Sequence, residues 1–581
     1  MLLLLIFVIG GGLRFAWPDR LAVEHFDEGV YASNIWFGPD DSFRYPEQHL
    51  YAPPLLPTLI EWVFTLAGPS NFGAMLPSLV AGSLMIPLVW WVGRRWFGPM
   101  AGLAAATLCA LSDPHVVFSR SALTDVLLCF WLLLAVHLIW RSLTTGGVWS
   151  AIGAGACTGL AWWTKYNGWL PLAIGWSALI PWLIRKKMCA GDATTLRRLM
   201  LPTIRLTVIT LVGLAAWSPW IWSLQSRGGY SAVAANHRKY VVGIAGWWNS
   251  AVEQAAKLRE LSGSPAAHAV LVALLIAALA IRWTDSRFTW NDLARRLSAR
   301  AMAALILFML LAGGPTFFGP ALFSLGASVL GLVLMHLNLW RSREAGPRSY
   351  SVWLLTAWFV GMTVSTPAYT PYPRLLLPWQ VSTWLAVGLL LQHILLQLAP
   401  DPVSSGIETE SARLSPWRLT ALLTAFAALL VSAESLAFPR EIPGWRDRSW
   451  VRRAATWVSR KAEDRSASDS RPGEPFVIYT ISEPALLFQL RLIGIEHVRP
   501  LSSLRLARED APRPVIPTFV LVGKQAMSMP GFPGELNSAW RRLREIWYAP
   551  TYSSPIVRLD DADWQEPPDG EISRTTLYEL H

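Results

Sequence analysis

The chain has 581 residues, of which 53% are hydrophobic and only 15% charged, and its mean hydropathy is +0.35. Soluble globular domains carry about 25% charged residues, so this composition excludes an ordinary soluble protein and indicates an integral membrane protein. The net charge of +11 does not indicate a nucleic acid partner, because the basic residues fall largely between apolar segments, where they set membrane topology.

The first segment, MLLLLIFVIGGGLRFAW, lacks both a basic leading region and an A-x-A cleavage site. We therefore expect a retained first span and not a signal peptide. The chain has four cysteines, and they lie in predicted spans or on a predicted cytoplasmic loop: Cys109, Cys129, Cys157 and Cys189. This placement indicates neither a disulfide framework nor a cysteine-based metal site.

Thirteen segments are apolar enough to be spans, since a helix needs roughly 20 residues to cross the hydrocarbon core and fewer where protein surrounds it. They are 1–17, 73–93, 99–112, 121–140, 148–164, 169–184, 204–224, 266–283, 301–316, 318–340, 350–366, 375–398 and 418–437. The division of 301–340 into two spans rests on the sequence Gly313-Gly314-Pro315. Thirteen spans place the two chain ends on opposite sides of the membrane.

Basic residues between these spans fall on one side, which the positive-inside rule makes cytoplasmic. The pairs Arg94/Arg95 and Arg185/Lys186 are examples. The loop 18–72 and the tail that follows residue 437 are then exoplasmic. The loop is rich in aromatic residues and proline, which favours amphipathic helices lying on the membrane, and a second such loop covers about 225–265.

The tail, 438–581, differs in composition because its arginine, acidic and proline content is high. Short apolar runs predict buried strands at 476–479 and 518–522, and amphipathic stretches predict helices at 449–462, 483–492 and 534–547. The fold class is therefore mainly α, a polytopic transmembrane domain (1–437) followed by an exoplasmic α/β domain (438–581). The tail has neither a glycine-rich phosphate fingerprint nor a nucleophile elbow.

Charged residues at the exoplasmic span ends include both signs, which is costly near a membrane unless the charges serve each other or a ligand. Asp27 and Glu28 follow the first span, and Asp125 and Lys165 lie in consecutive spans at similar depth. The acidic pair is either simply solvated or functional. Asp125 and Lys165 either close the bundle as an ion pair, or Asp125 orients Lys165 toward an anionic ligand.

Arg374, in the sequence TPYPR, either binds a phosphate through its guanidinium fork or anchors a lipid headgroup. Tyr51 favours interfacial packing, and His237 lies in a basic stretch that favours an exposed loop. The candidates for supporting roles on this face are Tyr31, Tyr51, Arg120, Asp125 and His237. Asp113 and His115 would need further ligands to hold a metal, and no spacing demands one.

Asp27 suits one reaction in particular, glycosyl transfer from a lipid-linked sugar phosphate. That reaction needs a base for the acceptor hydroxyl, while its leaving group is already an anion and needs nearby cations or a metal but no general acid. One exoplasmic carboxylate with lysine and arginine around it meets both needs.

Five stretches in order, HFDEGVYA, APPLLP, SRSALTDVLL, WWTKYNGWLPL and TPYPRLLLPW, resemble the GT-C glycosyltransferases of the protein-O-mannosyltransferase and aminoarabinose-transferase type. The resemblance covers residues 1 to about 400. It implies a multi-spanning hexosyl- or pentosyltransferase of the cell envelope. Such an enzyme takes a sugar from a polyprenyl phosphate on the exoplasmic side and transfers it with inversion.

The resemblance also implies roles for residues. Asp27 matches the catalytic base, and Glu28 matches a neighbour that contacts the acceptor or a divalent metal ion, whose involvement stays open. Lys165 matches the basic residue at the end of the fifth span, and Tyr372 and Arg374 match the donor-phosphate element.

One departure concerns the loop before Pro53-Pro54, where aminoarabinose-transferase relatives often have lysine. This chain offers His49, Tyr51 and Ala52 there, so His49 is our candidate for phosphate contact from that loop. Nothing transfers to the tail from the resemblance.

Two other functions stay open. A lipid or sugar transporter without transferase activity would usually show internal repeats and charges near the bilayer midplane, whereas here the charges gather at span ends. A scaffold would depend on the tail alone. Our expected location is a bacterial inner membrane with the site on the periplasmic face. The expected partners are the bilayer, a lipid-linked donor and an acceptor that is a protein, lipid or glycan.

Overall fold

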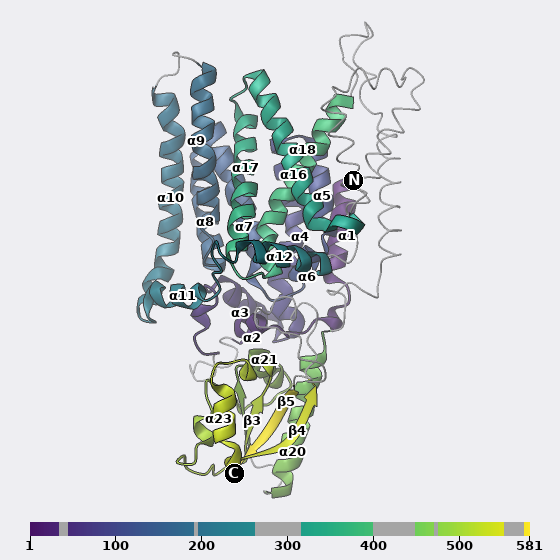
Figure 1. The fold of residues 1–581 in the computed structure, drawn as a ribbon, viewed down its shortest axis with the longest axis vertical. Helices are drawn as coiled ribbons and strands as arrows, with labels where there is room; N and C mark the ends of the chain where they lie inside the picture. The colour runs from purple at the N-terminus through teal and green to yellow at the C-terminus, as the bar shows by residue number, and fades with distance from the viewer. Residues whose placement is uncertain (34–44, 191–195, 262–314, 399–447, 470–474, 551–573) are drawn as a thin grey trace, which may run out of the picture.

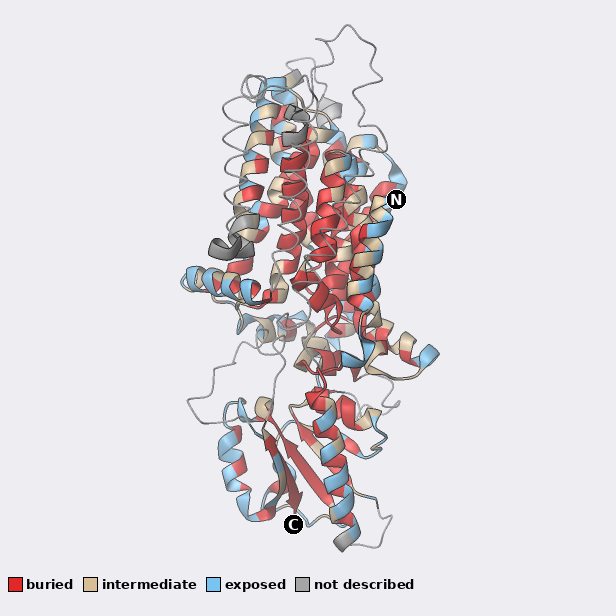
Figure 2. Ribbon diagram, turned by 90° about the vertical axis from the view of Figure 1, so that its right-hand side faces the viewer, coloured by how far each residue is buried: buried red, intermediate tan, exposed pale blue. Residues whose placement is uncertain are grey.

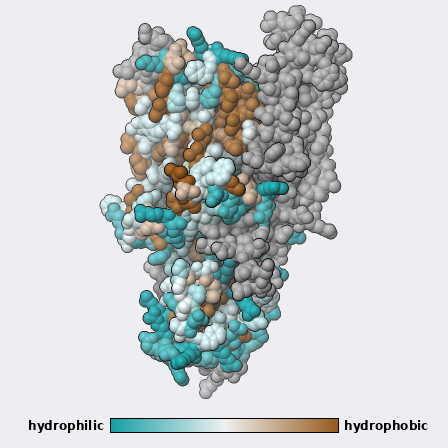
Figure 3. All heavy atoms as spheres, viewed as in Figure 1, coloured by the Kyte–Doolittle hydropathy of each residue, from teal (hydrophilic) through white to brown (hydrophobic). Residues whose placement is uncertain are grey.

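The computed structural model describes residues 1–33, 45–190, 196–261, 315–398, 448–469, 475–550 and 574–581. Figure 1 shows a bundle of long helices joined to a small α/β domain, with short helices crossing between the two. On the face shown in Figure 3, apolar side chains gather over the long helices and polar ones over the α/β domain. On this face, the apolar residues that indicate a membrane protein are thus concentrated in the bundle.

Except for α6 (Asp113–Ser119), which lies between two predicted spans, the helices of the bundle arise from apolar segments that were expected to be spans. Its helices are α1 (Leu2–Phe15), α4 (Asn71–Trp96), α5 (Pro99–Leu111), α6, α7 (Thr124–Thr145), α8 (Val148–Thr164), α9 (Leu170–Ala190), α10 (Leu196–Gln225), α16 (Pro315–Ser342), α17 (Pro347–Ser365) and α18 (Leu377–Leu398). Figure 2 shows their buried residues concentrated along the middle of the bundle.

The prediction of thirteen spans is not confirmed. Among the described residues, four helical stretches are long and apolar enough to cross a membrane: Asn71–Trp96, Thr124–Thr145, Met200–Gln225 and Pro373–His393. A fifth is α5 with α6, two helices bent by 60° at their junction. The predicted spans 266–283 and 418–437, and nearly all of 301–316, lie outside the described residues.

The bend between α5 and α6 has a local cause. Ser112 has an extended backbone and accepts a hydrogen bond from the amide of His115, 3.5 Å away, so it begins a new helix while α5 ends. Pro114 occupies the first turn of α6, where its missing amide costs nothing. After the bend, α6 packs against α4.

Short helices cross the end of the bundle nearest the α/β domain (Figure 1). The first loop contributes η1 (Pro18–Arg20), α2 (Phe26–Ala32), η4 (Gln48–Leu50) and α3 (Leu55–Ala67), and the second contributes α11 (Gly229–Arg238) and α12 (Trp247–Leu261). The turns η6 (Thr366–Ala368) and η7 (Pro373–Leu376) join α17 to α18. The helices predicted in both loops are therefore present.

The tail folds around one five-stranded sheet of order β2-β1-β3-β5-β4. The strands are β1 (Val477–Ile481), β2 (Val498–Leu501), β3 (Thr518–Val522), β4 (Leu543–Pro550) and β5 (Arg574–Leu580), and the helices and turns are α20 (Trp450–Asp469), α21 (Pro484–Leu492), η9 (Arg505–Ala507), α22 (Lys524–Met527), α23 (Phe532–Ser538) and η10 (Trp540–Arg542). Strands β2, β1 and β3 are parallel, and β5 runs antiparallel to β3 and β4.

Both predicted strands and the first two predicted helices of the tail are confirmed. The helix expected at 534–547 is wrong, because α23 ends at Ser538 and strand β4 begins at Leu543. Pairing of β4 with the C-terminal strand β5 outweighs the local helical pattern. The domain boundary at residue 438 lies outside the described residues and stays a prediction.

Candidate active site

Helix α2 begins with a capping box that fixes the direction of Asp27. The ring nitrogen Nδ1 of His25 accepts a hydrogen bond from the Asp27 amide, 3.1 Å away. The Glu28 carboxylate accepts in return from the His25 amide at 3.0 Å. This reciprocal arrangement satisfies two amides that a helix N-terminus leaves unpaired. It sends the two neighbouring carboxylates in different directions.

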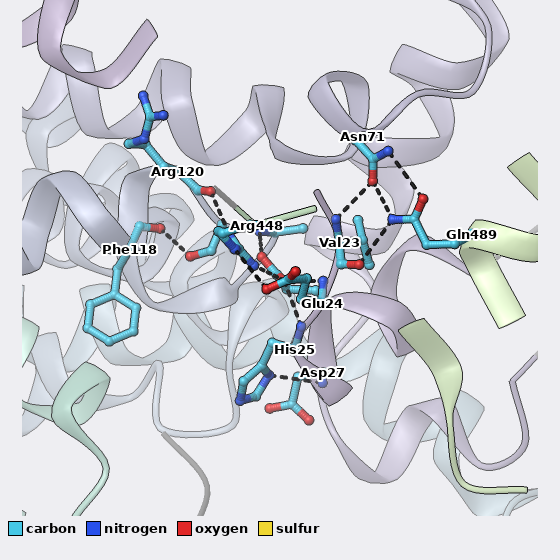
Figure 4. A network of polar contacts seen from close by, with 12 residues as sticks. Val23, Glu24, His25, Asp27, Asn71, Phe118, Arg120, Arg448 and Gln489 are labelled. Atoms are coloured by element: carbon cyan, nitrogen blue, oxygen red, sulfur yellow. Dashed lines mark hydrogen bonds and ion pairs between the residues drawn. The ribbon is translucent and has the colours of Figure 1, made fainter. Parts of the chain in front are cut away.

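Glu28 points inward and is completely buried. Its carboxylate also accepts from the amides of Glu24, at 3.0 Å, and Ala122, at 2.9 Å. It forms an ion pair with Arg448, whose guanidinium also donates to the Arg120 carbonyl at 3.0 Å. Figure 4 shows this network, with the Asp27 carboxylate pointing out of it. Glu28 thus fastens α2 to the α6–α7 connection and to the start of the tail.

The tail also packs directly on α2. A Cβ atom at Gly29 would lie 2.3 Å from the amide nitrogen of Ala485, so only glycine allows α21 to approach this closely. Beside it, the Gln489 side chain donates to the Val23 carbonyl at 3.0 Å and to the Asn71 side chain at 2.6 Å (Figure 4). The tail therefore contributes to holding the helix that carries Asp27.

Asp27 forms an ion pair with Arg374, with 2.7 Å between Oδ2 and Nη1. Both side chains are mostly buried, at 14% and 13% exposure. Burial raises the pKa of the Asp27 carboxyl, but the charges of Arg374, His25 and Lys165 lower it more, so the pKa lies below its usual value. Asp27 is therefore ionised at neutral pH.

Lys165 ends α8 and pairs with Asp125 of α7, with 2.5 Å between Nζ and Oδ1. The pairing expected from the sequence is thus present. Asp125 is 2% exposed, whereas Lys165 is 19% exposed. Asp125 holds the ammonium group of Lys165 in place, and Lys165 still reaches the space in front of Asp27.

That space is a cavity of about 780 Å³ between the end of the bundle and the α/β domain. Predicted site residues that line it are Asp27, Tyr31, Tyr51, Lys165, His237, Tyr372 and Arg374. The Arg374 guanidinium lies 5.2 Å from the centre of the Tyr372 ring. His237 accepts from or donates to the Tyr369 hydroxyl at 3.1 Å, and burial together with nearby Lys165 lowers its pKa.

Four other predicted site residues do not line the cavity: Glu28, His49, Arg120 and Asp125. The main-chain carbonyl of His49 accepts a hydrogen bond from the Tyr166 hydroxyl. Arg120 donates to the carbonyls of Arg14, at 2.9 Å, and Ala16, at 2.6 Å, and so ties the end of α1 to α6. These contacts support the site from outside it.

Sequence reasoning missed several lining residues. Lys239 and Tyr240 line the cavity, but they lie in a stretch that was interpreted as an exposed basic loop. Their closeness in sequence to His237, a predicted site residue, was the one feature that could have indicated their position. The tail adds Ser482, Gln525, Ser528, Met529 and Pro530, which lie after β1 or in and after α22 and belong to no recognisable motif.

Within the described ranges, no group of three or more His, Cys, Asp or Glu side chains comes close enough to hold a metal ion. Glu28, the residue considered for such a role, has its carboxylate oxygens engaged by amides and Arg448. These residues do not fit a metal at Glu28.

Residues 51–222 match the family model described as dolichyl-phosphate-mannose-protein mannosyltransferase. Two crystal structures of ArnT from Cupriavidus metallidurans, one bound to undecaprenyl phosphate and one in the apo state, have a TM-score of 0.53 to this chain. Each is 14% identical to this chain in sequence, and the match covers 99% of this chain and 97% of the ArnT chain. The chain has a GT-C glycosyltransferase fold.

A further solved structure has a lower TM-score. Archaeal oligosaccharyltransferase AglB from Archaeoglobus fulgidus, solved with an inhibitory peptide and a dolichol-phosphate, is 15% identical over 94% of this chain and 72% of its own, with a TM-score of 0.48. No curated protein sequence matches the chain. The GT-C resemblance inferred from five short stretches is thus confirmed at the level of the fold.

Proposed function

We propose that this protein is an integral-membrane glycosyltransferase that moves a sugar from a polyprenyl-phosphate donor to an acceptor hydroxyl or similar group, with inversion, on the exoplasmic side. The observation that carries the proposal is the gathering of Asp27, Arg374 and Lys165 in one cavity. A carboxylate and two cations in a mostly buried site are what this reaction requires.

In the proposed reaction, Asp27 takes the proton of the acceptor hydroxyl as the acceptor oxygen attacks the anomeric carbon. The bond between that carbon and the phosphate oxygen breaks, and the polyprenyl phosphate leaves with the electron pair. Arg374 and Lys165 stabilise the negative charge that develops on the leaving oxygen. Displacement in a single step, from the face opposite the phosphate, inverts the anomeric carbon.

Arg374 has a further part in this proposal, because it already contacts the base. A donor phosphate shares the guanidinium with Asp27, and the carboxylate then loses part of the charge that lowers its pKa. Asp27 becomes a stronger base when a donor is in place. Support for a polyprenyl phosphate comes from ArnT, which has the same fold and was crystallised with undecaprenyl phosphate.

The proposed side of the membrane follows from the charges at the helix ends. Helix α4 ends with Arg94 and Arg95, and α9 has Lys187 in its last turn. The Lys165 end of α8 and the start of α9 lie at the cavity, opposite those basic ends. By the positive-inside rule, the cavity then faces the exoplasmic side, which in a bacterial inner membrane is the periplasm.

The test uses purified protein in proteoliposomes with a panel of polyprenyl-phosphate sugars, and mass spectrometry follows donor consumption. We expect one donor class to be consumed. Asp27→Asn should reduce the rate about a hundredfold or more, because a positioned base contributes that much. The variant should keep the wild-type elution profile and donor binding. Wild-type turnover by Asp27→Asn would remove Asp27 from the mechanism, and labelled lipid crossing the bilayer without a covalent product would favour a transporter.

A further inference from the structure

Two loops of the α/β domain form one wall of the cavity. Ser482 directly follows β1, and Gln525, Ser528 and Met529 lie in and after α22, which follows β3. The first loop and the bundle supply the rest of the lining, and Phe26, Asp27 and Tyr51 come from the first loop. The α/β domain therefore closes the cavity in which Asp27 lies.

The two loops follow the carboxyl ends of β1 and β3, two neighbouring parallel strands of the sheet. Strand β1 pairs in parallel with β2 on one side and with β3 on the other. The chain leaves β1 for β2 and then crosses to β3, so the strand order switches at β1. In open α/β sheets, ligands bind in the crevice outside the carboxyl ends of the strands at such a switch point. Ser482 and the segment 525–529 lie at those two carboxyl ends.

The two loops are fixed to each other. The Ser482 hydroxyl donates to the Met529 sulfur at 2.9 Å. The Glu483 carboxylate accepts from the Gln525 amide at 2.9 Å and packs so closely on Gly523 that a Cβ atom there would lie 2.2 Å from it. Ser482 has a φ of +50°, a strained conformation for a residue with a side chain. Such strain is typical of functional sites held in place by their surroundings.

We propose that this switch point is the acceptor site of the enzyme, and that it takes an uncharged, hydroxyl-rich acceptor, namely a carbohydrate. The inference rests on the proposed function and deepens it. The site brings an acceptor hydroxyl between the tail wall and Asp27.

The chemistry of the wall selects this class of acceptor. The lining residues of the tail offer hydroxyl, amide and thioether groups, while the charged lining residues Asp27, Lys165, Lys239 and Arg374 all belong to the bundle and its loops. In the first loop, the rings of Phe26 and Tyr51, which also line the cavity, lie 5.4 Å apart and offer apolar faces beside these polar groups.

Peptide recognition by strand addition needs an exposed sheet edge. Strands β1 and β3 do not offer one, because both lie inside the sheet: β1 pairs with β2 and β3, and β3 pairs with β1 and β5. The wall therefore recognises its ligand through side chains.

The experiment compares acceptor kinetics of full-length variants in nanodiscs, with the donor that the panel identifies. The acceptors are a set of neutral oligosaccharides, a charged oligosaccharide and a peptide rich in Ser and Thr. Gln525→Ala and Ser528→Ala should each raise the KM for the best neutral oligosaccharide, because each removes a hydrogen bond or two. The double variant should raise this KM about tenfold. The donor KM, and donor hydrolysis with water as acceptor, should stay unchanged.

Ser538→Ala is the matched control, because Ser538 lies in the same domain, is exposed like Ser528 and also donates to a main-chain carbonyl. It should leave every kinetic constant unchanged. An unchanged acceptor KM in both site variants overturns the acceptor site. Preference for the peptide or the charged oligosaccharide, or rejection of all neutral ones, overturns the carbohydrate assignment. Failure of the proposed function is distinguishable, since then the donor itself is not consumed.

Discussion

The ion pair between Asp27 and Arg374 shows how one carboxylate can stay charged in a buried site. Burial alone would raise its pKa, and the cations around it reverse the direction. The sequence allowed Asp27 and Arg374 to be placed at the same membrane face, because topology follows from apolar length and basic flanks. It did not show that they touch, because 347 residues separate them and no local pattern records such a contact.

Replacing Arg374 tests this balance. In Arg374→Gln, burial should dominate and the pKa of Asp27 should rise, so the acidic limb of the pH profile of kcat/KM should move to higher pH. In the wild type, the lowered pKa keeps Asp27 ionised until the pH falls through that pKa, so the base stays active to a lower pH. The same ionised carboxylate stabilises the fold over that pH range, and this stability is lost as the pH falls through the lowered pKa.

The measurement is initial-rate kinetics across the acid range. Arg238→Gln is the control, because Arg238 is exposed on α11 and does not line the cavity. It should keep the wild-type profile. An acidic limb that stays in place in Arg374→Gln would mean that another group sets it.

At the scale of elements, the sequence predicted a helix in the first loop, but it did not predict the direction in which each carboxylate of helix α2 points. The apolar helices of the bundle, the strands β1 and β3 and the helices α20 and α21 follow from the pattern within each segment and were predicted, although the number of thirteen spans is not confirmed. The inward turn of Glu28 was not, because it depends on Arg448, 420 residues away in sequence. Adjacent carboxylates on a helix cannot face the same way, so a capping box that uses Glu28 leaves Asp27 for the cavity.

We therefore expect Glu28 and Arg448 to act as one unit that positions α2. Glu28→Gln and Arg448→Gln should each destabilise the protein by about 3 kcal/mol, as breaking a buried ion pair does. Each should lower kcat by a similar factor, and the double variant should lose no more than the larger single loss, because coupled residues are not additive. Thermal unfolding and initial rates provide the measurements.

Arg465→Gln serves as the control, because Arg465 pairs with Glu579 inside the tail, at 3.0 Å, and does not line the cavity. It should keep the wild-type kcat. An inactive Glu28→Gln beside a fully active Arg448→Gln would assign Glu28 to the chemistry.

At the scale of the whole molecule, the bundle and the α/β domain share one site, since the cavity is lined by both. Composition predicted a distinct tail domain but gave no sign that it closes the cavity. Packing of α2 on α21 depends on Gly29, and a glycine within a helix has several explanations until the partner surface is known.

Gly29→Val tests whether that contact is required. A side chain at residue 29 would overlap the backbone of Pro484 and Ala485, so the tail must move away from α2. We expect transfer to the acceptor to fall more than donor hydrolysis, because the acceptor wall is displaced while Arg374 and Lys165 remain in the bundle. Donor hydrolysis, acceptor transfer and the distance between fluorophores on α23 and on the basic end of α4 would be measured together. Gly534→Val is the matched control, since a side chain at Gly534 meets open space. Equal transfer by both variants would show that the tail acts without close contact to α2.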